Sequence, residues 1–219
     1  MIDFIQSEAS FFIFCLTTLF TLINPIGIAP LLLVMTERFS KQEKINIAWK
    51  GSFTAFFTLI LFAILGSFIF NVFGITIEAF QIMGGILFFR NGLRMLEVKV
   101  GRSRTTPAEQ EESQESDDIA ISPIGIPLIA GPGAITAAML LSSQTPQYYS
   151  YVTLGLSIFL VLSLVYLILR NGDVLMNVLG TTGMRIIQRL MGLILLIIAV
   201  QFVINGAVSV IRPLISPSF

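Results

Sequence analysis

Residues 11–36 read FFIFCLTTLFTLINPIGIAPLLLVMT, a stretch without a charged side chain. An α-helix needs about 20 apolar residues to cross the ~30 Å hydrocarbon core of a bilayer, and this stretch is long enough. Because lipid offers no hydrogen-bond partners, a spanning segment must satisfy its backbone polar groups internally, as a helix. The stretch therefore predicts a membrane-spanning helix, with helix-breaking residues at Asn24-Pro25.

The rest of the chain repeats this pattern. Of its 219 residues, 55% are hydrophobic and 12% are charged, whereas a soluble domain carries about 25% charged residues. The charged residues are clustered, and the apolar stretches between the clusters are long enough to be membrane spans. The predicted fold is an all-α membrane protein with six spans, at residues 11–36, 46–70, 75–96, 119–143, 148–169 and 184–210.

Basic residues predict the orientation, because short connections rich in Lys and Arg stay in the cytoplasm. The first, third and fifth connections carry such residues, whereas the second, the fourth and the N-terminus carry none. This alternation predicts that both termini are external. Residues 97–118 are polar and become strongly acidic, so we expect a flexible cytoplasmic linker there. A partner-binding segment is the alternative.

Two motifs of the first half recur in the second half. The NPIGI motif of residues 24–28 is echoed by SPIGI at residues 122–126, and NVFGIT at residues 71–76 by NVLGTT at residues 177–182. Each copy holds an odd number of predicted spans, so the second copy enters the membrane from the opposite side. The pattern predicts two inverted three-helix repeats, residues 1–96 and 119–219, within one membrane domain. Secondary transporters often have this plan, with the substrate site between the repeats; chance similarity of apolar segments is the alternative.

The first and fourth predicted spans are broken near mid-membrane. Asn and Ser are favoured N-caps and Pro is a favoured first helical residue, so Asn24-Pro25 and Ser122-Pro123 predict helix starts. Residues 130–133 (AGPG) add an interruption, and with Pro30 and Pro127 they make continuous helix unexpected in either span. A helix that starts there presents free N–H groups, which suit a carboxylate. Structural kinks are the alternative. The predicted substrate-binding residues are Asn24, Pro25, Gly27, Pro30, Pro123, Gly125, Gly131, Pro132, Gly133 and Thr136.

Ionisable residues inside the predicted spans are scarce and are functional candidates. Glu78 begins the third span, where a carboxylate complements the helix dipole; a proton-carrying or gating role is the alternative, and Gln81 is a second gating candidate. The chain has no histidine and one cysteine, so we expect no metal site, no catalytic centre and no cofactor. Without an acidic residue at mid-span, a zwitterion or neutral solute fits better than a strongly cationic one.

The motifs at residues 24–30 (NPIGIAP) and 127–136 (PLIAGPGAIT) resemble the MarC family of bacterial and archaeal membrane proteins, and the resemblance continues through residues 73–80 (FGITIEAF) and 83–87 (MGGIL). It covers nearly the whole chain. The resemblance implies a six-helix protein of the bacterial or archaeal cytoplasmic membrane, grouped with small neutral amino acid transporters. Arg90-Asn91 and the acidic linker lie outside the family pattern, so we assign them no family role.

These patterns together predict a secondary transporter or exporter of small neutral amino acids or similar zwitterions, working by alternating access. The chain has no G-x-x-x-x-G-K-[ST] loop, so direct ATP drive is not expected. The alternatives are a non-transporting membrane scaffold or assembly factor and, with less support, an intramembrane enzyme. The expected partners are the lipid bilayer and a small solute, with no nucleic acid; oligomer formation is left open.

Overall fold

The computed structural model describes residues 2–97, 120–144 and 148–215, and every regular element within them is a helix. These elements are α1 (Ile2–Ile23), α2 (Pro25–Met35), α3 (Lys41–Phe73), α4 (Ile77–Leu96), η1 (Ala120–Ile129), α7 (Pro132–Ser143), α8 (Tyr148–Arg170) and α9 (Gly172–Ile215). The prediction of an all-α fold is confirmed. The predicted linker, residues 97–118, lies outside the described residues except for Glu97, the C-cap of α4.

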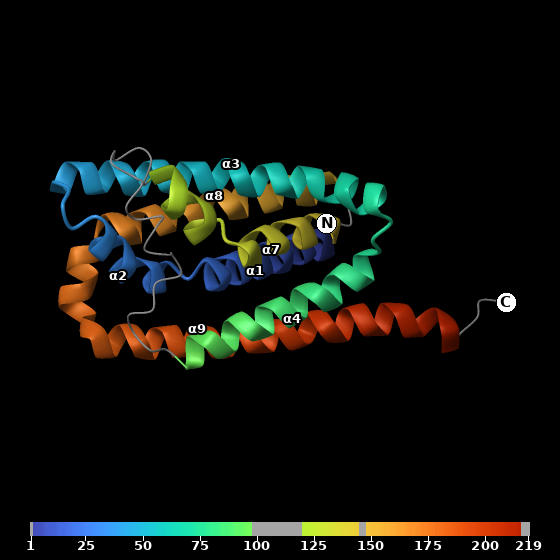
Figure 1. Cartoon of the computed structure of the whole chain (residues 1–219). Helices are drawn as coiled ribbons and strands as arrows, with labels where there is room; N and C mark the ends of the chain where they lie inside the picture. Colours follow the sequence, from blue (N-terminus) through green and yellow to red (C-terminus); the bar gives the residue numbers. More distant parts are fainter. Residues whose placement is uncertain (1, 98–119, 145–147, 216–219) are drawn as a thin grey trace.

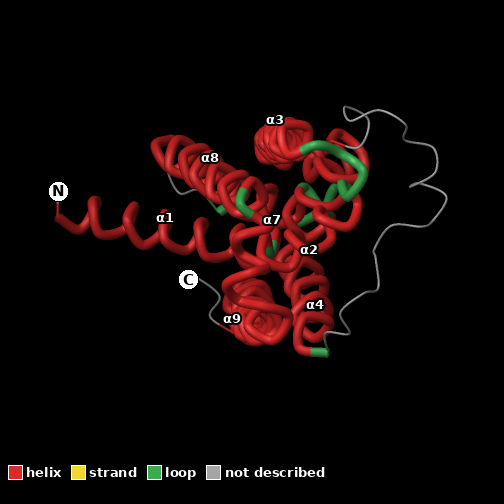
Figure 2. Tube along the Cα trace, turned by 90° about the vertical axis from the view of Figure 1, so that its left-hand side faces the viewer, coloured by secondary structure: helices red, strands yellow, loops and turns green. Residues whose placement is uncertain are grey.

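The helices are arranged in layers, seen from the side in Figure 1 and end-on in Figure 2. α3 and α8 form one outer layer, α4 and the second part of α9 form the other, and the remaining helices lie between them. α3 packs on η1, α7 and α8, whereas α8 also packs on α1 and α2. α4 packs on α9 and α7, and α9 also packs on α2. Most of these interfaces join a helix of the first half to one of the second, so the halves share one core.

Local sequence signals set the helix ends around α3. Ser40 and Glu43 form a capping box at its start, in which the Ser40 N–H donates to Glu43 Oε2 at 2.8 Å. α3 stops before Gly74, whose φ of 63° lies in the left-handed region that glycine adopts at no steric cost. The Thr76 hydroxyl oxygen then accepts the Ala79 N–H at 3.2 Å and starts α4. This short segment therefore turns the chain back across the bundle.

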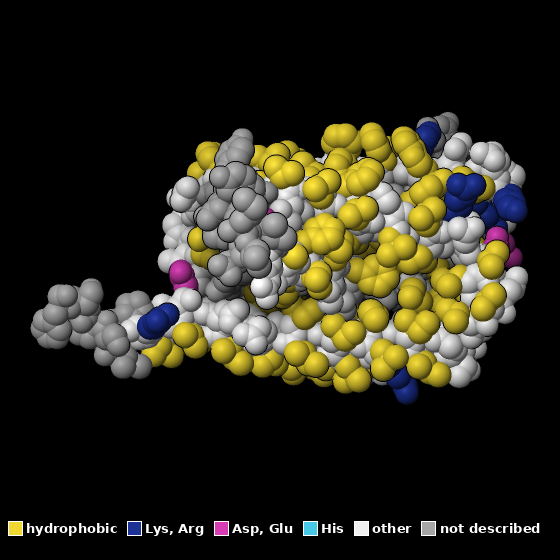
Figure 3. All heavy atoms as spheres, turned by 180° about the vertical axis from the view of Figure 1, so that it is seen from behind, with side chains coloured by type: hydrophobic (Ala, Val, Ile, Leu, Met, Phe, Trp, Pro, Cys, Tyr) yellow, Lys and Arg dark blue, Asp and Glu magenta, His cyan; other side chains and the backbone are white. Residues whose placement is uncertain are grey.

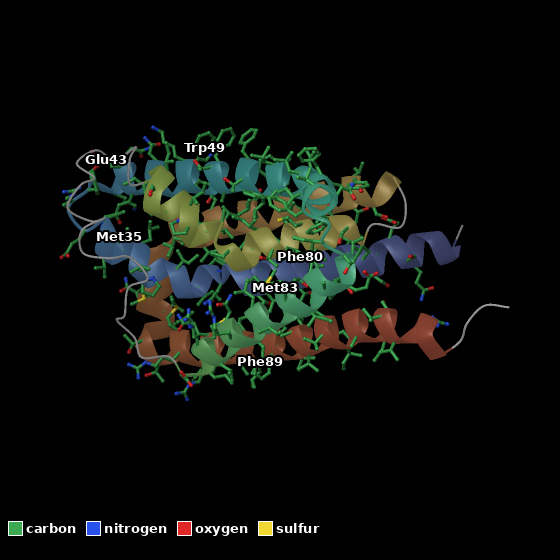
Figure 4. All side chains as sticks on the ribbon, turned by 45° about the vertical axis from the view of Figure 1, so that its right-hand side comes forward. Met35, Glu43, Trp49, Phe80, Met83 and Phe89 are labelled. Atoms are coloured by element: carbon green, nitrogen blue, oxygen red, sulfur yellow. The ribbon has the colours of Figure 1, made fainter. Side chains whose placement is uncertain are left out.

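The outer surface is apolar. Figure 3 shows hydrophobic side chains across the middle of the bundle, with Lys and Arg mainly toward one end. Trp49 on α3 and Phe89 on α4, both labelled in Figure 4, lie on outer faces and are 49% and 41% exposed. Soluble proteins rarely expose so much contiguous apolar surface, so this surface is suited to lipid.

The described residues contain four segments long and apolar enough to cross a membrane: Gln6–Met35, Lys41–Gly66, Ser150–Arg170 and Gly172–Arg212. The pair η1 and α7, bent by 60°, makes a fifth if it is counted as one span. α4 is not among them. It has 20 residues, but Glu78, Arg90 and Arg94 lower its apolar content. The structure thus supports four or five of the six predicted spans.

Two predicted span starts differ most from the helices. The first span is predicted to start at residue 11, but α1 begins at Ile2 and its apolar segment at Gln6. The last span is predicted to start at residue 184, whereas α9 begins at Gly172 and is interrupted at Gly180, which has a φ of 60°. The prediction relied on apolar length, while backbone hydrogen bonds continue the helices into polar flanks.

Candidate functional site

The first break consists of Asn24, between α1 and α2. Its φ of 52° and ψ of 61° are left-handed, a conformation that Asn tolerates because its short side chain bonds locally. Asn24 Oδ1 accepts the Gly27 N–H at 3.2 Å, and Pro25 occupies the first turn of α2. The predicted helix start at Asn24-Pro25 is confirmed. The span is therefore not one continuous helix, as predicted, although Pro30 itself does not interrupt α2, which continues to Met35.

The second break separates η1 from α7. Ser122 and Ile126 have extended backbone angles inside η1, so the predicted irregularity of this segment is confirmed. Gly131, at the N-cap of α7, is also extended, and Pro132 opens the helix. No side chain caps this helix, because Gly131 has none to offer. The first turn of α7 therefore lacks the side-chain acceptor that Asn24 supplies to α2.

The start of α7 meets α1 and α4 at Gly133. A Cβ at this position would lie 3.3 Å from Leu22 Cδ2, two residues before the break at Asn24. It would also lie 3.0 Å from Asn91 Nδ2, so the Asn91 amide reaches this turn from α4. Glycine keeps the space between these side chains open, because it has no Cβ. The two breaks thus lie near one another inside the bundle.

α4 closes this site from one side. A Cβ on Gly84 would lie 3.3 Å from Thr136 Cγ2, so α4 and α7 approach closely at this point. Thr136 is 8% exposed and so lies on the buried surface of α7. Gln81 is also buried, but it lies against Gly206 of α9. Glu78 lies in the first turn of α4, the position predicted for a charge that complements the helix dipole.

The remaining predicted residues do not all join the site. Gly125 packs against α3, where an added Cβ would lie 2.9 Å from Thr54 Cβ. Pro132 is exposed, whereas Pro25 is buried in the core. The side chain of Pro123 lies outside the described residues. The structure therefore places Gly131, Gly133 and Thr136 at the start of α7, which Leu22, two residues before Asn24, approaches, and Gly125 packs on α3.

A cavity of about 460 Å³ lies between α1, α8 and α9. It is lined by Leu16, Thr17, Phe20, Thr21, Leu160, Val161, Leu164, Met191 and Ile194. None of the predicted substrate-binding residues is among them. The Thr17 hydroxyl donates to the Ile13 carbonyl at 2.8 Å, so this hydrogen is already used within α1. The lining of the cavity is therefore largely apolar. Such a lining suits a hydrocarbon chain better than a zwitterion, which needs polar partners.

Two contacts were not predicted from the sequence. Ser150 Oγ donates to Glu8 Oε1 at 2.8 Å and Thr153 Oγ1 donates to Glu8 Oε2 at 2.6 Å, which links α1 to α8. The sequence prediction places Glu8 before the first span, although it lies two helical turns from the buried Cys15 and so on the same face. Asn91 received no role because it lies outside the motifs that carry the resemblance, and no local signal identifies it.

The chain is similar to known membrane proteins over most of its length. The family model for MarC family integral membrane proteins matches residues 9–211. A UPF0056 membrane protein of Methanocaldococcus jannaschii is 36% identical, over 91% of this chain and 97% of the relative. The UPF0056 membrane protein of Pyrococcus abyssi is 37% identical, over 86% of this chain and 90% of the relative. That of Bacillus subtilis is 36% identical, over 90% of this chain and 94% of the relative. No solved structure matches. The relatives' names state a membrane location and no activity.

Proposed function

Since the chain belongs to the MarC family of integral membrane proteins, we propose that it is a secondary transporter of small neutral amino acids or similar zwitterions. The family and the apolar helices establish a multi-pass membrane protein with bacterial and archaeal relatives. The class of solute and the transport mechanism are our proposals. Both rest on the site between the two broken segments.

The observation that carries the proposal is the uncapped start of α7 inside the bundle. Gly133 and Ala134 are buried there, and their N–H groups lie at the positive end of the helix dipole. A solute carboxylate supplies the acceptors that no side chain provides. The Asn91 amide nitrogen, which reaches the same turn from α4, is a further donor for that carboxylate. A small zwitterionic amino acid presents such a carboxylate.

Two inverted repeats would place this site at their interface. In the proposed repeat, α1, α2, α3 and α4 correspond to η1, α7, α8 and α9. Corresponding helices make corresponding contacts: α3 packs on η1 as α8 packs on α1, and α4 packs on α7 as α9 packs on α2. The two glycines of the recurring motif, Gly74 and Gly180, both have positive φ, 63° and 60°. This agreement supports the repeat, because motif, conformation and packing follow the same correspondence.

The crossing of α4 and α9 supports the same correspondence. A Cβ on Gly92 would lie 3.0 Å from the Gly192 carbonyl oxygen, and a Cβ on Gly85 would lie 2.7 Å from the Ala199 carbonyl oxygen. In the proposed repeat, Gly85 corresponds to Gly192 and Gly92 corresponds to Ala199. The contact between Gly92 and Gly192 therefore corresponds to the contact between Ala199 and Gly85. A two-fold axis in the membrane plane would therefore pass through this crossing, with α4 as the sixth span, packed on α9.

In this proposal, the two repeats move relative to each other and so give alternating access to the site. If one repeat rocks against the other, the start of α7 faces opposite sides of the membrane in turn. The basic residues support the predicted orientation, with both termini external, because Arg38, Lys41 and Lys44 lie in and just after the connection between α2 and α3. Figure 3 shows the Lys and Arg side chains of that face mainly toward one end of the bundle.

The test is transport by purified protein in liposomes. We expect saturable uptake of at least one radiolabelled small amino acid, such as glycine, alanine or serine, under an imposed pH or sodium gradient. Liposomes without protein provide the control. If correctly folded protein neither takes up nor releases any amino acid under either gradient, the transport proposal is wrong and the scaffold alternative gains support.

A further inference from the structure

We propose that the cavity between α1, α8 and α9 holds an acyl chain of a membrane phospholipid. This inference does not depend on the proposed transport, because the cavity is lined by none of the residues predicted to bind the solute. Its volume of about 460 Å³ lies within the range of sites that hold small organic molecules. An empty cavity of this size would strongly destabilise the bundle, so we expect an occupant.

The cavity lies near the middle of three segments that are long and apolar enough to cross a membrane. Its lining falls within residues 16–21 of Gln6–Met35, residues 160–164 of Ser150–Arg170 and residues 191–194 of Gly172–Arg212. These positions are close to the centre of each segment, so the cavity is at the depth of the hydrocarbon core. Headgroups and bulk water begin about 15 Å away, at the two surfaces of that core. Acyl chains are therefore the molecules that surround the protein at this depth.

The lining of the cavity suits a hydrocarbon chain. No described residue that lines the cavity is ionisable, and its two polar residues, Thr17 and Thr21, carry hydroxyl groups. The Thr17 hydroxyl already donates to the Ile13 carbonyl. A buried water typically makes about three hydrogen bonds, so a cluster of waters would leave most of its hydrogen bonds unmade here. A hydrocarbon chain needs none, and it gains packing contacts with three helices at once.

The cavity is continuous with the lipid-facing surface of the bundle. Val161 and Thr21 are 3% and 1% exposed, whereas Leu160 and Leu164 of the same lining are 46% and 45% exposed. The lining thus runs from the core to the apolar outer surface, and a chain can enter sideways from the bilayer. α8 packs on α3, α1 and α2 but only slightly on α9. An inserted chain would supply packing between α8 and α9.

Photolabelling tests the site with a defined lipid. We would reconstitute the full chain into lipid nanodiscs that contain a small fraction of phosphatidylglycerol with a diazirine near the end of one acyl chain, and locate the labelled residues by peptide mass spectrometry. We expect labelling at residues 160–164 and 191–194 to exceed several-fold that at Phe57 and Leu61 of α3, which are 55% and 53% exposed and do not line the cavity. Phosphatidylethanolamine with the same labelled chain should label equally, because its headgroup does not reach this depth.

Two variants fill the cavity with protein. Val161→Phe and Ile194→Phe each add volume to the lining, so labelling of α8 and α9 should fall several-fold, whereas Leu61→Phe, outside the cavity, should label as the native protein does. Added phosphatidylglycerol should raise the melting temperature in detergent less in the two filled variants than in the native protein, because a ligand stabilises only the protein that binds it.

Three results would overturn the proposal. The first is equal labelling of α3 and the cavity, which would indicate surrounding lipid alone. The second is native labelling in both filled variants, or labelling by one headgroup class only. The third is a dimer without bound lipid in native mass spectrometry, which would indicate that a second copy of the chain covers the cavity. None of these results bears on amino acid uptake, so the two proposals fail separately.

Discussion

Replacing Gly133 by alanine tests whether the start of α7 binds a solute. The added methyl group would lie 3.0 Å from Asn91 Nδ2 and 3.3 Å from Leu22 Cδ2, the ends of two side chains that can shift by a few tenths of an ångström. Packing an extra methyl group costs about 1 kcal/mol at such a site, and alanine regains up to about 1 kcal/mol of helix propensity. We therefore expect the free energy of unfolding to change by less than about 1 kcal/mol.

Solute binding should change far more than stability. The methyl group occupies the space in which a carboxylate would approach the amides, and one hydrogen bond to a charged group contributes about 1.5–3 kcal/mol. Its loss lowers affinity about ten- to hundredfold. The assay compares the half-saturating concentration of uptake, normalised to folded protein, with thermal unfolding in detergent. Gly155→Ala in α8 is the matched control, because nothing lies within 4 Å of the added Cβ. Native half-saturation in Gly133→Ala would refute the site.

Three further predictions concern stability and topology. Gly85→Ala should destabilise the protein by about 1–3 kcal/mol in thermal unfolding, because its Cβ would lie 2.7 Å from the backbone oxygen of Ala199, which cannot move aside; a native melting temperature would contradict the close crossing. Deleting residues 105–116 should leave membrane insertion intact, as measured by the membrane-bound fraction, since this polar segment cannot bury enough apolar area to fold; loss from the membrane would show a structural role. In the Cys15→Ser background, Ser103→Cys should resist an impermeant maleimide in intact cells and react after lysis; labelling in intact cells would reverse the orientation.

The breaks were predictable from sequence because helix starts depend on local chemistry. Asn24-Pro25 and Gly131-Pro132 combine a residue suited to the N-cap position with a proline that has no N–H to lose, and both begin helices. Pro30 illustrates the limit of the same reasoning. It removes one backbone donor, but the surrounding helix is packed on α9 and tolerates the loss.

The assembly of the site was not predictable in the same way. Asn91 and Gly133 are 42 positions apart in the sequence and meet only because α4 packs on α7. Glu8 was overlooked because a carboxylate near the start of an apolar segment reads as a solvated end, and its partners Ser150 and Thr153 are common in any helix. Contacts of this kind depend on tertiary packing, which periodicity and capping signals do not encode.

The shared core has a consequence for how such a chain arose. Most helix interfaces lie between residues 2–97 and residues 120–215, so either half alone would leave its apolar faces without partners. The molecule is in effect a dimer within one polypeptide, and the connection raises the local concentration of one half around the other. Under the proposed inverted repeat, an ancestral gene for a single half would have needed a product that inserted in both orientations and paired with its own inverted copy. Under the same proposal, duplication and fusion would allow the halves to differ, with Asn24 at one break and Gly131 at the other.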